Sequence, residues 1–350
     1  MTGKEIIGAA IKLQAVPRCP ATLMSAGAWA LNSAGISLEK ALSSDPEKIA
    51  AVLYEAYNRV GSDIFWAVSG FNNILIGAIG GKIKFRSKGT PDVIEPLVKH
   101  ISDIDGSDGT SGIGINAFKD TPNMRFLYET TRFLVQRTGG TNFVALTRWG
   151  PFTLAGLLYG AENLMRSIYR DPASVHRLLE WTTALYLADA QNYIDSGVDF
   201  ALVAEPTASG DMISREHFAE FALPAFTRVF TALKQKGIAT CLHICGNIEN
   251  RLDLLNGIGA DLISVDYKVS LKKCREIFGG KTAFAGNMNP VGIIQRESPE
   301  GVAKACEQCI TEAGEDTGYI LMPGCDIPPS TPVENIKAMV NTGKNTRRIV

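Results

Sequence analysis

Eight short apolar runs alternate with helical patterns along the 350 residues, and this alternation limits the fold more than any other feature. The runs cover residues 20–24, 63–68, 142–147, 199–204, 239–243, 261–265, 282–285 and 318–322. They are continuously apolar, which is typical of parallel strands that are covered on both faces. Eight strand–helix units in succession predict an α/β fold, a single (β/α)8 barrel of the TIM type over residues 1–350.

Local signals place helices between these runs. Asp171-Pro172 combines a capping residue with proline at the first helical position, and Thr331 begins a capping box before the last helix. Residues 80–120 interrupt the alternation and are rich in Gly, Asp and Lys. We expect this segment to be an excursion over the mouth of the barrel.

Composition and charge exclude several classes of protein. The formal net charge is −1, whereas a nucleic-acid-binding protein normally carries a basic surplus or stripe. No apolar run reaches the length of a membrane span, and the N-terminal residues lack the apolar core of a signal peptide. We therefore expect a cytoplasmic protein whose partners are neither nucleic acid nor membrane. The seven cysteines fit this expectation, because an odd number at irregular spacing indicates thiols rather than a disulfide framework.

The ends of the fifth and eighth runs carry the residues that most resemble a metal site. His243 and Cys245 are two residues apart on an extended segment, so both side chains point to the same side and can chelate one ion. Cys325 follows the eighth run, and Gly246 and Gly324 let the backbone turn close to that ion. Three such ligands with an open fourth position are typical of catalytic zinc. The alternative of ordinary core residues stays open, because the fifth and eighth strands of a barrel are not neighbours.

Other polar residues have weaker patterns. Glu205 ends the fourth run and precedes Pro206, which places it on the rim of the barrel. Three roles are open for its carboxylate: a fourth zinc ligand that substrate displaces, a catalytic group that binds substrate, or a cap at the strand end. Cys306 and Cys309 form a Cys-x-x-Cys pair, but they share an apolar helix face, which favours core packing.

Several of these motifs together resemble a known family. They cover residues 205–209, 243–247, 286–290 and 318–335. Through them the chain resembles the uroporphyrinogen decarboxylase-like barrel family, and within it the methyltransferase branch. That branch includes methylcobamide:coenzyme M methyltransferases and corrinoid-dependent demethylating enzymes. The decarboxylase branch fits poorly, because residues 23–29 contain no arginine and Asn72-Asn73-Ile74-Leu75 stands where that branch has a Ser-Asp-Ile-Leu segment with its catalytic aspartate.

The resemblance implies that His243, Cys245 and Cys325 bind zinc, and that the chain moves a methyl group to or from the cobalt of a corrinoid. A partner protein would supply the corrinoid, since none of the four histidines lies in a corrinoid-binding Asp-x-His-x-x-Gly segment. The small molecule is either a thiol, such as coenzyme M, or a methyl ether, as in an O-demethylase system. Two alternatives remain: a metal-free uroporphyrinogen decarboxylase-like lyase, and a scaffold whose zinc is structural.

Overall fold

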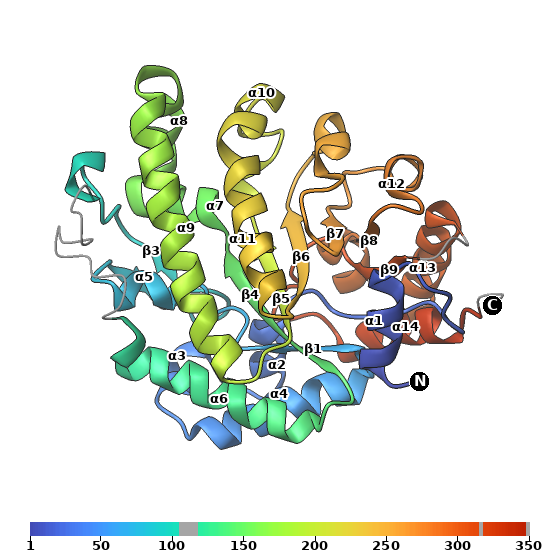
Figure 1. Ribbon diagram of the computed structural model, residues 1–350. Coiled ribbons are helices and arrows are strands. Elements are labelled where there is room, and N and C mark those ends of the chain that lie inside the picture. Colours follow the sequence, from blue (N-terminus) through green and yellow to red (C-terminus); the bar gives the residue numbers. More distant parts are fainter. Residues whose placement is uncertain (105–117, 315–317, 348–350) are drawn as a thin grey trace.

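The computed structural model describes residues 1–104, 118–314 and 318–347 of the chain (Figure 1). A curled parallel sheet of seven strands forms its centre, in the order β1-β4-β5-β6-β7-β8-β9. The strands are β1 (Ile64–Ala67), β4 (Phe143–Trp149), β5 (Phe200–Ala204), β6 (Ala239–Ile244), β7 (Leu262–Val265), β8 (Ala283–Met288) and β9 (Tyr319–Pro323). Each overlaps a predicted run and is buried along almost its whole length, which confirms the predicted fold class.

The first predicted run, residues 20–24, closes the ring between β9 and β1 without forming a regular strand. The Leu321 amide donates to Pro20 O (2.9 Å), and the Asp63 amide donates to Ala21 O (3.1 Å). Two local features prevent a longer ladder, because Pro20 has no N–H and the Ala21 amide donates to the Asp63 side chain at 3.0 Å. The run therefore contributes a single bridge, Ala21 to Leu321.

Helices surround the sheet (Figure 1). They are α1 (Gly3–Ile11), α2 (Gly27–Ser33), α3 (Leu38–Leu42), α4 (Pro46–Val60), α5 (Ile74–Ala78), α6 (Pro122–Thr138), α7 (Pro151–Tyr159), α8 (Ala161–Arg170), α9 (Pro172–Asp195), α10 (Arg215–His217), α11 (Leu223–Gln235), α12 (Leu271–Phe278), α13 (Pro299–Ala313) and α14 (Val333–Asn345). Asp171 caps α9 as predicted, since its side chain accepts a hydrogen bond from the Ser174 amide at 3.1 Å. The predicted capping box at Thr331 is wrong, because α14 begins at Val333 and the Thr331 hydroxyl donates to Pro328 O at 2.8 Å.

The segment 80–120 interrupts the strand–helix alternation. Its described part consists of β2 (Ile83–Lys84), β3 (Asp92–Val93), η1 (Ile101–Ile104) and η2 (Phe118–Asp120). This part packs beside the barrel, where η1 contacts α9 and the Val98 amide donates to Leu158 O of α7 at 2.8 Å. Residues 105–117 lie outside the described residues, so coverage of the barrel mouth stays a prediction.

Aromatic side chains fill the interior of the barrel. Phe200 lies between Trp66 and Phe143, at centroid distances of 6.2 and 5.6 Å. These rings belong to a cluster of buried apolar side chains that extends into the helix layers. That residues 1–350 form a single domain stays our prediction. Within the part of the chain that the structure describes, every helix is too short or too polar to cross a membrane.

Candidate metal centre

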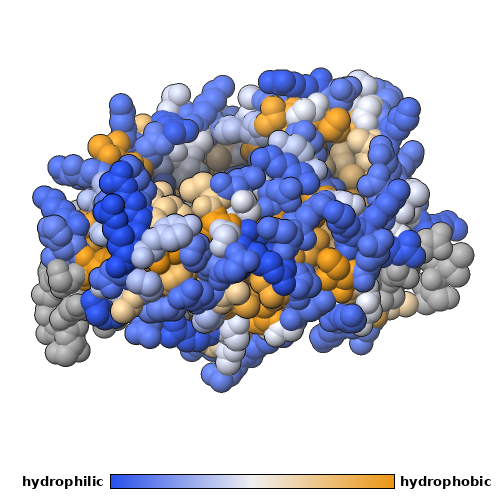
Figure 2. All heavy atoms as spheres, turned by 90° about the horizontal axis from the view of Figure 1, so that it is seen from above, coloured by the Kyte–Doolittle hydropathy of each residue, from blue (hydrophilic) through white to orange (hydrophobic). Residues whose placement is uncertain are grey.

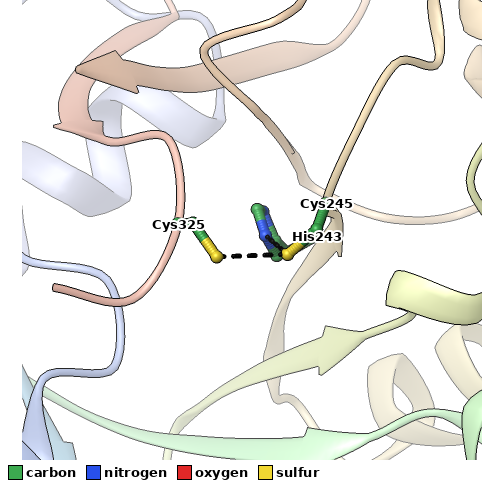
Figure 3. Close-up of side chains that lie close together, drawn as sticks. All are labelled: His243, Cys245 and Cys325. Atoms are coloured by element: carbon green, nitrogen blue, oxygen red, sulfur yellow. Dashed lines mark hydrogen bonds between the residues drawn. The ribbon is translucent and has the colours of Figure 1, made fainter. Parts of the chain in front are cut away.

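His243, Cys245 and Cys325 come together where the strands of the barrel end (Figure 3). Nε2 of His243 lies 3.0 Å from Cys245 Sγ, and Cys245 Sγ lies 3.2 Å from Cys325 Sγ. All three ligand atoms lie within 4.8 Å of one another, which no other group of three His, Cys, Asp or Glu side chains in the described ranges achieves. His243 is buried, whereas the two cysteines are partly exposed, so the cluster is accessible from the sulfur side.

Gly324 explains how Cys325 reaches a ligand on a strand that is not its neighbour. The Gly324 amide donates to Met288 O at 2.8 Å, which draws the segment after β9 across the end of β8. A Cβ at this position would lie 2.6 Å from the Tyr267 amide nitrogen, after β7. Only glycine lets the backbone pass this closely, and the passage brings Cys325 to Cys245 over two intervening strands.

Ser264 fixes the orientation of the histidine ring. It lies on β7 directly opposite His243 of β6, and its Oγ is 2.9 Å from His243 Nδ1. With the proton on Nδ1, the ring donates to Ser264 and keeps the Nε2 lone pair directed at the sulfur atoms. No sequence pattern indicates this partner, because the pairing depends on the register between two strands.

Asp266 holds the backbone of the turn that carries Cys245. Its carboxylate accepts hydrogen bonds from the Gly246 amide and the Lys268 amide, both at 3.0 Å. Gly246 has a left-handed φ of +86°, which a glycine adopts without strain. The turn is therefore pinned to the end of β7.

The two thiols share their protons unequally. The hydrogen bond from Cys245 lowers the pKa of the Cys325 thiol. The same bond, together with burial, raises the pKa of the Cys245 thiol. Cys325 therefore ionises more readily than Cys245.

Glu205 lies beside the cluster but does not join it. Its carboxylate accepts hydrogen bonds from the Phe152 amide (3.1 Å), the Thr153 amide (2.8 Å) and the Thr153 hydroxyl (2.8 Å) at the start of α7. Burial raises the pKa of Glu205 to about 8, although these three donors act in the opposite direction. The observed contacts are those of a cap on α7, and a role as catalytic group or fourth ligand stays a prediction.

The Cys306 and Cys309 pair lies apart from the metal-ligating group. Cys306 is fully buried on α13, and Cys309 Sγ lies 3.5 Å from Met288 Sδ. Burial raises the pKa of both thiols, to about 11 for Cys309. Protonated thiols in an apolar environment are poor metal ligands, so the structure supports core packing for this pair.

The chemistry of the three donors fits a zinc ion. Two thiols and one imidazole are soft or intermediate ligands, whereas Mg²⁺ and Ca²⁺ prefer oxygen. Three protein ligands with one accessible side correspond to a catalytic rather than a closed structural site.

Comparison with known proteins identifies the class of this protein. The model of the uroporphyrinogen decarboxylase (URO-D) family matches residues 2–346, so the chain belongs to this family. Its relatives include methyltransferases and decarboxylases, and the match to the former is the more extensive. The predicted resemblance to the methyltransferase branch is confirmed, and the chain is a methyltransferase.

Three similar proteins show where the chain lies within the family. A methylcobamide:CoM methyltransferase, MtbA, of Methanosarcina acetivorans is 29% identical over 350 residues, with 98% of each chain covered. A uroporphyrinogen decarboxylase of Carboxydothermus hydrogenoformans is 25% identical over 302 residues, with 84% of this chain and 82% of that protein covered. A solved structure of a methyltransferase from Methanosarcina mazei has the same fold, with a TM-score of 0.85 at 22% identity and 98% of both chains covered.

Proposed function

We propose that the chain is a zinc-dependent methyltransferase that moves a methyl group between a small molecule and the cobalt of a corrinoid carried by a partner protein. The main support is the convergence of His243, Cys245 and Cys325 within 4.8 Å at the open end of the barrel. The relative from Methanosarcina acetivorans is a methylcobamide:CoM methyltransferase by name, which supports a cobamide as the second reactant here.

The residues of the site prepare a fourth coordination position. Zinc held there would act as a Lewis acid that favours ionisation of a thiol, or loss of a methyl group from an oxygen or sulfur atom. Cys245 and Cys325 would release their protons on binding and supply two negative charges. With its Nδ1 proton donated to Ser264, His243 would present an unprotonated Nε2 to the ion.

The same position serves both directions of transfer. With a methyl ether, the bond between methyl carbon and oxygen breaks, and the reduced Co(I) corrinoid supplies the electron pair of the new carbon–cobalt bond. The oxygen keeps the pair of the broken bond and takes up a proton. With a thiol, such as coenzyme M, the sulfur loses its proton and supplies the pair to the methyl carbon, and the corrinoid keeps the pair of the broken carbon–cobalt bond.

Glu205 has a supporting role in this proposal. Its carboxylate holds the start of α7 against the end of β5, one residue beyond the Ala204–His243 pair. A direct role as catalytic group or fourth zinc ligand would require the carboxylate to leave all three of its donors.

The test combines zinc removal with assays in both directions. Purified protein should carry about one zinc per chain. It should transfer methyl from methylcobalamin to 2-mercaptoethanesulfonate or to a phenol, and from a methyl ether to reduced cobalamin, which the visible spectrum of cobalt reports. Both activities should disappear with a chelator and return with zinc.

The control experiment compares the circular dichroism spectra of the zinc-loaded and the zinc-free protein. Because apolar burial stabilises the barrel, the circular dichroism spectrum should change little after zinc removal. Loss of the spectrum would indicate a structural zinc. Decarboxylation of uroporphyrinogen by the zinc-free protein, without methyl transfer in any pairing, would replace the proposal with the lyase alternative.

A further inference from the structure

Arg251 is a buried cation that no acidic side chain neutralises. Hydrophilic residues cover most of the face shown in Figure 2, where they reach solvent. Arg251, on η5 (Glu249–Leu255) after β6, is instead 0% exposed and forms no ion pair with an aspartate or glutamate of the described residues. Arg148 is similarly buried at 3% exposure, but its Nε donates to Asp189 Oδ2 at 2.9 Å. Burial lowers the pKa of Arg251, because a charge removed from water is unfavourable unless other groups compensate it.

Backbone carbonyls take the place of an acidic partner. Arg251 Nη1 donates to Ala208 O at 3.1 Å, and Nη2 donates to Ile213 O at 2.8 Å. The guanidinium also lies 5.1 Å from the centroid of the Phe218 ring. Hydrogen bonds from a charged donor are stronger than those between neutral groups. Arg251 therefore ties together the two ends of the loop 208–213, which follows β5.

This loop packs against the turn that carries Cys245. The Gly210 amide donates to Asn247 O at 2.9 Å, and a Cβ on Gly210 would lie 2.5 Å from that oxygen. On the other side of the contact, a Cβ on Gly246 would lie 2.7 Å from Asp211 Oδ2. Both glycines therefore let the loop and the turn approach more closely than larger residues would allow.

The contacts of the turn determine where Cys245 lies, because β6 ends one residue before it. Asp266 holds the turn from the β7 side through the Gly246 amide at 3.0 Å. The loop 208–213 holds it from the β5 side through Asn247 O. Metal–ligand distances in proteins vary by only about 0.2 Å, so a shift of either support would reach the metal site.

We propose that Arg251 is a positioning residue of the metal site. Its guanidinium fixes the loop 208–213, the loop fixes the turn after β6, and the turn holds Cys245 in place for the ion. None of the three hydrogen bonds of Arg251 goes to a metal ligand, so it acts through this loop. The inference rests on the metal site of the proposed function and adds a residue on which zinc affinity depends.

Zinc affinity tests this role, and Arg148 provides a matched control. The Arg148 guanidinium also lies beside an aromatic ring, 4.4 Å from the Tyr193 centroid, but it contacts α9 rather than the turn after β6. In competition with a chromophoric chelator, Arg251→Met should bind zinc about tenfold more weakly than the wild type, or weaker still. Arg148→Met should stay within about threefold, although it should unfold at a lower urea concentration because Asp189 loses its partner.

Cobalt(II) in place of zinc reports the geometry of the site in each variant. Thiolates bound to Co²⁺ give sulfur-to-metal charge-transfer absorption, and its intensity per bound ion reports how many thiolates are bound. Arg251→Met should lose part of this intensity and approach the value of Cys245→Ala, whereas Arg148→Met should keep the value of the wild type. A loss of stability alone would lower the fraction of folded protein but would not change the spectrum of each bound ion.

A milder pair of variants covers the case in which a methionine variant does not fold. Arg251→Lys and Arg148→Lys keep the buried charge but replace the forked guanidinium with a single nitrogen. Arg251→Lys should weaken zinc binding about threefold or more, while Arg148→Lys should leave it unchanged. Gly210→Ala keeps Arg251 but must push the loop from Asn247 O by at least 3.0 − 2.5 = 0.5 Å, so zinc affinity and charge-transfer intensity should fall together.

Two results would overturn the inference. One is wild-type zinc affinity with a wild-type cobalt spectrum in Arg251→Met, or in Arg251→Lys where only that variant folds. The other is an equal loss of zinc affinity in the Arg251 and Arg148 variants, which would reduce both arginines to a general role in stability. A wild type that binds neither zinc nor cobalt would instead contradict the proposed function.

Discussion

Gly324→Ala should damage the metal site while leaving most of the barrel in place. The added Cβ would lie 2.6 Å from the Tyr267 nitrogen and 3.2 Å from both Asn287 O and the Asp266 carbonyl carbon. All three neighbours are backbone atoms, so no side chain can rotate to make room. Contacts of a Cβ below 3.0 Å are essentially absent from proteins, so the loop must move by at least the difference, 3.0 − 2.6 = 0.4 Å.

This displacement is large compared with the tolerance of a zinc site. Metal–ligand distances in proteins stay within about 0.2 Å of their ideal values. Because Cys325 follows Gly324 directly, its Sγ would be carried away from Cys245 and His243. Mutation of residues that only contact the metal ligands weakens metal binding about 10- to 100-fold in other proteins. We therefore expect at least a tenfold loss of zinc affinity when a ligand itself is displaced. Overpacking should also cost about 1–3 kcal/mol of folding free energy.

Competition with a chromophoric chelator measures the zinc affinity, and urea unfolding measures the stability. The matched control is Gly8→Ala in α1, whose Cβ would come no closer than 4.0 Å to Phe143 Cε2. A helical glycine replaced by alanine in open space gains up to about 1 kcal/mol, so this variant should be neutral or more stable. Wild-type zinc affinity in Gly324→Ala would refute the argument that close backbone passage positions Cys325.

Three further predictions concern the ligands and their supports. Cys245→Ala and Cys325→Ala should lose most of the bound zinc in metal analysis, while Cys306→Ala should keep it, and the reverse pattern would disprove the ligand assignment. Ser264→Ala should weaken zinc binding about 10- to 100-fold in the chelator assay, and Ser264→Thr, which keeps a hydroxyl, should restore it. Glu205→Gln should keep its zinc and change the pH dependence of unfolding. Burial raises the pKa of this carboxyl from 4.5 to about 8, so the folded state holds a proton that the unfolded chain has released. Wild-type stability should therefore fall as pH rises from about 4.5 to about 8, by up to about 1.4 kcal/mol per pH unit, and the variant should lack this loss. Urea unfolding of both proteins at pH 5 and pH 8 measures this change in the free energy of unfolding. An equal change in the wild type and the variant would contradict the prediction.

Much of the fold was predictable because each strand is a continuous apolar run between turn residues. Seven of the eight predicted runs form strands. The remaining run, residues 20–24, does not, because Pro20 and the Asp63 side chain interrupt its hydrogen bonds to the neighbouring strands. The pairing of His243 with Cys245 was predictable as well, because it follows from the two-residue period of an extended chain.

The position of Glu205 shows what the sequence left open. It ends β5 as predicted, but whether its side chain faces the interior depends on the register between strands. Ala204 pairs with His243 and faces inward, so the next residue, Glu205, points outward to α7. The sequence of each strand alone does not determine the register between them. The contact between Ser264 and His243 could not be predicted for the same reason.

The distribution of the ligands explains why this fold can hold a reactive metal without depending on it. His243 and Cys245 belong to β6 and Cys325 follows β9, while β7 and β8 between them pair through backbone hydrogen bonds and need no metal. An ion at this point would therefore connect two strand ends that the barrel already positions, and its loss would release the Cys325 segment rather than the sheet. Because those intervening strand ends contribute Ser264 and Asp266 instead of ligands, the partly exposed Cys245 and Cys325 would leave one side of such an ion open.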